Sequence, residues 1–69
     1  MRRFALYHPS SDQYVSYLQY NRKTKQYDIE FTRSLHSIRF WKMKLSAEGQ
    51  AQRIFDWNRN AALEVREIR

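Results

Sequence analysis

The stretch that decides the fold is "YDIEFT", residues 27–32. Its apolar side chains are Tyr27, Ile29 and Phe31, and polar residues occupy the positions between them. Because successive side chains of a β-strand point to opposite faces of a sheet, this period of two predicts a strand with one apolar and one largely acidic face. The apolar face is expected to pack against a helix.

Two further strands are predicted before this one. Residues 3–8, "RFALYH", also alternate, and the turn formers of "PSSDQ" end that strand. The tyrosine-rich residues 14–20 have the composition of a strand, and "NRKTK", residues 21–25, fits a hairpin loop that leads into 27–32. We expect the cations of this loop and of the neighbouring strand to pair with the acidic face of residues 27–32.

A helix is predicted after a less regular connector. The connector, residues 33–44, is interpreted as irregular chain with a short strand near 38–42. Ser46 is the predicted N-cap, because its hydroxyl can accept a hydrogen bond from the unpaired amides of a first turn, where Glu48 would also favour the helix dipole. The helix is expected to run from about 46 to 58.

The predicted helix has an apolar stripe, and Phe55 stands at its centre, facing Ile29 and Phe31. The residues of the stripe are Ala47, Ala51, Ile54, Phe55 and either Trp57 or Asn58. Residues 58–60, "NRN", are expected to end the helix, because asparagine tolerates the left-handed conformation of a helix terminus. The tail, residues 61–69, fits a helix or a strand, and its alternation favours a strand.

These elements predict one α+β domain over residues 1–69. The expected architecture is an antiparallel sheet of three to four strands with one helix packed on one face, in the order β-β-β-α-β. A chain of this size without cysteine has neither a disulfide nor a thiolate metal site, so its stability has to come from aromatic burial or from a partner. The sequence has no apolar run of membrane-spanning length and no secretion signal, so a soluble cytoplasmic protein is expected.

The charge of the chain indicates the class of its partner. Thirteen Lys and Arg residues against seven Asp and Glu give a formal net charge of +6. A field of this sign speeds encounters with polyanions or with acidic proteins. The predicted binding surface combines basic and aromatic residues of 20–25 and 39–44: Tyr20, Arg22, Lys23, Lys25, Arg39, Trp41, Lys42 and Lys44.

Two interpretations of this surface stay open. In the first, exposed rings stack on bases while the loop cations pair with phosphates, as in proteins that bind single strands. In the second, the rings pack in the core and the cations are a solvated hairpin tip. Strand alternation places Tyr14 and Tyr20 on one face and Tyr17 on the other, so the three do not form one platform.

Trp41 also has two interpretations. If Ile38 and Phe40 point inward, Trp41 points outward among cations and suits the anchor of an interface. Alternatively, its indole covers the edge of a small core.

Nothing in the sequence indicates catalysis or a cofactor. The two histidines, His8 and His36, have no cysteine or carboxylate at a metal-ligand spacing and no visible catalytic partner. A single glycine, Gly49, is too few for a phosphate-cradling loop. A non-enzymatic binding protein without metal or cofactor is therefore expected.

Residues 31–57, "FTRSLHSIRFWKMKLSAEGQAQRIFDW", together with "LEVREI" at 63–68, resemble a pattern in small phage and prophage proteins of unknown function. The resemblance covers residues 27–68. The apolar positions of the pattern are occupied by Leu35, Ile38, Phe40, Ala47, Ala51, Ile54, Leu63 and Val65.

The resemblance implies a last strand that returns beside the first. Similar ββαβ arrangements occur in some phage inhibitors of host RNA polymerase and in some anti-CRISPR proteins, which act by binding in the cytoplasm of the host. The basic composition departs from that of acidic nucleic-acid mimics, and this counts against a DNA-mimic mechanism.

Three functional hypotheses follow. The first is a module that binds nucleic acid or a nucleic-acid-handling complex. The second is a phage-type inhibitor that binds an acidic patch on a host protein, such as RNA polymerase or a CRISPR effector. The third is a structural subunit that forms a homodimer or larger oligomer through its open sheet face or edge.

Overall fold

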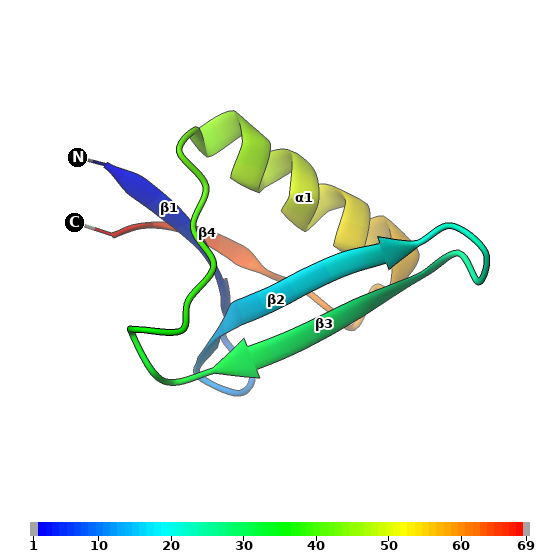
Figure 1. Cartoon of the computed structure of the whole chain (residues 1–69), viewed down its shortest axis with the longest axis horizontal. Coiled ribbons are helices and arrows are strands. Elements are labelled where there is room, and N and C mark those ends of the chain that lie inside the picture. The colour runs from blue at the N-terminus through cyan, green and yellow to red at the C-terminus, as the bar shows by residue number, and fades with distance from the viewer. Residues whose placement is uncertain (1, 69) are drawn as a thin grey trace.

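The structure is a computed structural model, and it describes residues 2–68. The chain forms β1 (Arg3–His8), β2 (Gln13–Asn21), β3 (Gln26–Thr32), α1 (Lys44–Trp57) and β4 (Glu64–Ile68). The four strands form an antiparallel sheet in the order β3-β2-β1-β4, and α1 lies across one face of it (Figure 1). This confirms the predicted α+β fold, the strand in the tail and its position beside the first strand.

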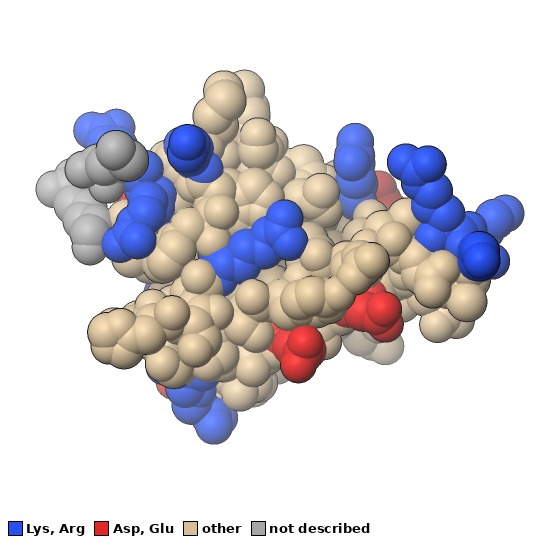
Figure 2. Space-filling view, viewed as in Figure 1, with Lys and Arg blue, Asp and Glu red and all other residues tan. Residues whose placement is uncertain are grey.

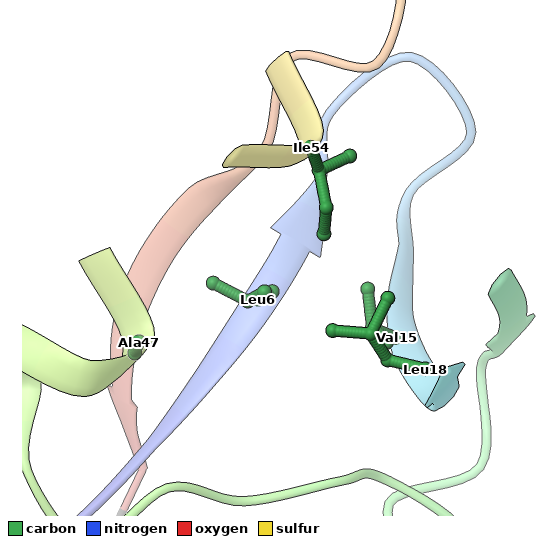
Figure 3. Packing of buried hydrophobic residues seen from close by; sticks show 5 residues of the cluster. All are labelled: Leu6, Val15, Leu18, Ala47 and Ile54. Carbon is green, nitrogen blue, oxygen red and sulfur yellow. The ribbon is translucent and has the colours of Figure 1, made fainter. Parts of the chain in front are cut away.

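The core lies between α1 and the face of the sheet that α1 covers, here called the helix face. Leu6, Val15 and Leu18 of the sheet point toward Ala47 and Ile54 of the helix (Figure 3). Fully burying an aliphatic side chain of this size contributes about 1.5–3 kcal/mol. Because this cluster is small, larger residues that are only partly buried extend it, among them Phe4, Tyr27, Ile29, Phe31 and Trp41.

A β-bulge at Ser16 changes the faces of β2. The register shifts there, so that Val15 lies opposite Phe31 while Leu18 lies opposite Ile29. Val15 and Leu18 are both buried on the helix face although they are three residues apart. A bulge inserts one extra residue into the strand and thereby reverses its alternation.

This bulge changes which face of the sheet each tyrosine of β2 occupies. Tyr20 pairs with Tyr27 on the helix face, and their ring centroids are 4.8 Å apart. Tyr14 and Tyr17 lie on the opposite face, here called the outer face, where the ring of Tyr14 is 5.1 Å from that of Tyr7. The prediction that Tyr14 and Tyr20 share a face is therefore wrong.

Residues 38–41 fill the gap where β1 and β2 diverge. Phe4 and Trp41 exchange two backbone hydrogen bonds, and the amide of Arg39 donates to the carbonyl of Val15. The short strand predicted near 38–42 is thus present only as an isolated bridge. Trp41 is half-buried and packs against the core, so the interpretation that it covers the edge of the core is correct and the outward orientation is wrong.

The helix begins two residues earlier than predicted. Its N-cap is Met43, which has an extended backbone and makes no side-chain capping hydrogen bond. Ser46 therefore lies inside the first turn and Glu48 beyond it, and the N-cap prediction is wrong. The bridge at Trp41 is the physical reason, because it fixes the chain just before the helix starts.

The end of the helix also differs from the prediction. Its last residue is Trp57, and Asn58 is extended, with its amide donating to the carbonyl of Ile54 at 2.8 Å. Asn58 therefore does not adopt the left-handed conformation that was expected at the end of the helix.

The buried stripe of α1 is centred on Ala47 and Ile54 rather than on Phe55. Phe55 is half-buried on the flank of the helix that faces residues 62–65, and the guanidinium of Arg59 lies 4.8 Å from its ring centroid. The predicted packing of Phe55 on β3 is wrong, because the helix is rotated so that Ile54 points into the sheet.

Candidate functional site

The eight predicted site residues fall into three groups on the folded chain. Figure 2 shows Lys and Arg side chains at the hairpin end of the molecule, at the opposite end, and between α1 and β2. Arg22, Lys23 and Lys25 are at the tip of the β2–β3 hairpin; Tyr20, Arg39 and Trp41 are beside α1; and Lys42 and Lys44 are at the start of the helix.

The hairpin tip is a defined turn. The side-chain oxygen of Asn21 accepts hydrogen bonds from the amides of Lys23 at 2.9 Å and of Thr24 at 3.3 Å. Lys25 has a left-handed backbone with φ of 57°, which closes the loop. The turn therefore holds its exposed cations beyond the end of the helix, as Figure 1 shows for the hairpin.

A groove runs between β2 and one flank of α1. It consists of two adjoining hollows of about 320 and 310 Å³, which share Gln50 and Arg53. We call it the β2–α1 groove. Its principal side chains are Tyr20, Tyr27, Arg39, Trp41, Leu45, Gln50 and Arg53.

Arg39 is held in place inside this groove. Its Nη1 donates to the carbonyl of Leu18 at 2.9 Å, and its guanidinium carbon lies 5.1 Å from the ring centroid of Trp41. A guanidinium has five N–H donors, so this arrangement leaves donors for an anion. The predicted residues Tyr20, Arg39 and Trp41 are thus brought together.

Within residues 2–68, the cations of the groove and the tip have no carboxylate partner. Among residues 2–68, the side-chain ion pairs are Arg2–Glu67, Arg59–Asp56 and Arg66–Glu64, and all of them lie elsewhere. Asp28 and Glu30 are on the outer face of β3, so the predicted pairing with the loop cations does not form. The positive charge around the groove is therefore uncompensated.

Sequence reasoning missed the part of this groove that α1 supplies. Gly49, Gln50 and Arg53 come from one flank of α1. A Cβ atom added at Gly49 would meet nothing within 4 Å, so the missing side chain leaves this part of the groove open. Their spacing of three and four residues is the only signal in the sequence that places them on one flank.

Other features of the molecule fit a binding site less well. A larger hollow, of about 570 Å³, lies on the other flank of α1, and its lining includes the carboxylates of Glu48 and Glu64. His8 is 2.7 Å from the hydroxyl of Ser11, and residues 2–68 contain no cluster of three or more His, Cys, Asp or Glu that could hold a metal.

In the described part of the chain, no helix is long and apolar enough to cross a membrane. No family model, curated protein or solved structure matches this chain significantly. Its function is therefore inferred from geometry and charge.

Proposed function

We propose that this protein binds nucleic acid, or a nucleic-acid-handling complex, through the β2–α1 groove and the hairpin tip, and that it catalyses no reaction. The observation that carries the proposal is a set of cations that have no carboxylate partner among residues 2–68 and that lie in the groove, at the hairpin tip and at the start of α1, near partly exposed rings. These cations are Arg22, Lys23, Lys25, Arg39, Lys42, Lys44 and Arg53.

The chemistry of nucleic acids complements both parts of this surface. Lysine and arginine side chains that neutralise phosphates release condensed counterions, and this release drives binding. Aromatic rings add stacking with bases. Of the rings in the groove, Tyr20 is 45% exposed and so offers the largest free surface.

In line with the resemblance to small phage proteins, we place this activity in the cytoplasm, that of the host cell if the chain is phage-encoded.

One observation favours a second candidate, an inhibitor that binds an acidic patch on a host protein. Met43 and Leu45 are 61% and 76% exposed and alternate with Lys42 and Lys44 at the start of α1. Exposed apolar anchors ringed by cations suit such an interface. Binding of this kind would survive treatment with nuclease.

The first experiment measures affinity for a fluorescent mixed-sequence oligonucleotide as a function of salt. Replacing Arg22, Lys23 and Lys25 together by Gln should reduce the slope of log affinity against log salt by up to about 2, since each neutralised phosphate contributes about 0.7–0.9 to it.

The matched control replaces Arg2, Arg33 and Arg59 by Gln. Both variants lower the formal charge of +6 by three, but the control removes cations outside the groove and the tip. The control should keep the parental slope. Equal slopes for the two triple variants would reject the hairpin tip as part of the site.

A further inference from the structure

We propose that the ligand of the β2–α1 groove is a single strand of nucleic acid, whose bases stack on Tyr20 and whose phosphates follow Arg39, Arg53 and the hairpin tip. This inference rests on the proposed function and specifies its ligand.

The rings of the groove differ in their freedom to stack. Tyr27 lies between two other rings, with centroids 4.8 Å from Tyr20 and 5.4 Å from Trp57, the latter in an edge-on arrangement at 61°. Trp41 is stacked by Arg39. Tyr20 makes one tilted ring contact and keeps much of its surface exposed, so it offers the stacking platform. Only bases that are not stacked in a duplex can use it.

The helix is unsuited to enter the major groove of a duplex. Its side away from the sheet carries Glu48, Gln52 and Asp56, and all three are exposed. The Gln52 amide donates to Asp56, whose carboxylate lies 3.9 Å from Arg59. A helix in the major groove would bring these carboxylates close to both phosphate backbones.

The hairpin is unsuited to the same role. A two-stranded ribbon also fits the major groove, but the outer face of β3 exposes Asp28 and Glu30 just behind the tip. In Figure 2 the Asp and Glu side chains visible below β2 lie on the side away from α1. The cations of the hairpin tip and those of the β2–α1 groove thus lie on the side of the hairpin opposite these carboxylates, which suits one strand rather than two.

The flank of α1 that lines the groove leaves room for a base at Gly49. Gly49 has no side chain, and nothing lies within 4 Å of the position of its Cβ. Gln50, which is half-buried, is the amide side chain shared by the two hollows.

The test is an anisotropy titration of the whole protein with four labelled probes about 12 nucleotides long, which is within the span that small folds cover on a single strand. The probes are single-stranded DNA, single-stranded RNA of the same sequence, the DNA duplex, and an abasic strand with the same number of phosphates. We expect both base-bearing single strands to bind at least about tenfold more tightly than the duplex or the abasic strand.

Two tyrosine variants form a matched pair for this test. Tyr20 in the groove and Tyr17 on the outer face are 45% and 40% exposed. Tyr20→Ala should weaken binding of the base-bearing single strands by about fivefold to a hundredfold and leave the abasic strand unaffected, because each stacked base is worth about 1–3 kcal/mol. Tyr17→Ala should change neither the affinity for the base-bearing single strands nor the affinity for the abasic strand.

A third variant keeps the test decisive if Tyr20→Ala unfolds. Gly49→Glu places a carboxylate in the groove where no atom is displaced, so it should preserve the fold and weaken the single strands at least about tenfold. Equal affinity for duplex and single strand would overturn the inference and leave the proposed function standing. Absence of salt-dependent binding to every probe would overturn both.

Discussion

Ile54 and Phe55 are neighbours in α1, but their side chains have different surroundings. Ile54 is fully buried in the core cluster, whereas Phe55 is half-buried on the flank of the helix, under the guanidinium of Arg59. The cost of a truncation depends on the cavity that it leaves and on the surface that it exposes. The smaller of the two side chains is therefore the more important one for stability.

We predict that Ile54→Ala lowers the free energy of unfolding by about 2–5 kcal/mol, a large part of what a small domain possesses. Phe55→Ala should cost less, because solvent already reaches that ring. Urea denaturation followed by circular dichroism measures both. A greater loss for Phe55→Ala than for Ile54→Ala would show that the helix is rotated differently on the sheet.

Tyr7 provides a prediction about pH. Its hydroxyl donates to the carboxylate of Asp12 at 2.5 Å, and this hydrogen bond raises the pKa of Tyr7 above its ordinary value of 10.0. Because the pKa is raised in the folded state, the associated stability is present below about pH 10 and is lost as pH rises through the pKa of the folded protein.

An ultraviolet titration of the tyrosines should therefore contain one component above pH 10 that Tyr7→Phe removes. The variant should also lose less stability than the parent between neutral and strongly alkaline pH. If Asp12→Asn leaves the titration of Tyr7 unchanged, the hydrogen bond is not the cause of the shift.

At the scale of elements, the alternation of apolar and polar residues in the sequence was sufficient to predict β1 and β3. In β3 one face lies on the core, so its apolar residues repeat with the period of two that the prediction uses; in β1 Phe4 and Leu6 follow the same period, although Ala5 between them is also buried. In β2 the same rule wrongly placed Tyr20 on one face with Tyr14. The bulge at Ser16 is stabilised by pairing with β3, and nothing in the composition of β2 indicates it.

The sequence also failed to predict two other features, the first residue of the helix and the β2–α1 groove, for a related reason. Ser46 satisfies the local preference for an N-cap, but the bridge between Phe4 and Trp41 positions the chain so that the helix begins earlier. The groove exists because α1 packs on β1 and β4 and leaves a hollow toward β2, which Arg39 and Arg53 both line. Contacts between elements distant in the sequence decide both features, so local patterns do not contain them.

At the scale of the whole molecule, charge is divided between two sides. Cations that have no carboxylate partner in the described part of the chain occupy the groove and the hairpin tip, whereas Asp28 and Glu30 occupy the outer face of β3. A polyanion approaching the molecule is attracted to the first side and repelled from the second. The division orients the ligand before contact, and the rings of the groove then hold it.

The central claim is that this groove, and not the outer face of the sheet, is the binding surface. The most direct test is an NMR titration of isotopically labelled protein with the single-stranded probe, following backbone amide shifts. We predict that the largest shifts occur at Gly49, Gln50 and Arg53 and that Tyr17 and Glu30 scarcely change. Large shifts at Tyr17 and Glu30, with the groove unaffected, would contradict the claim.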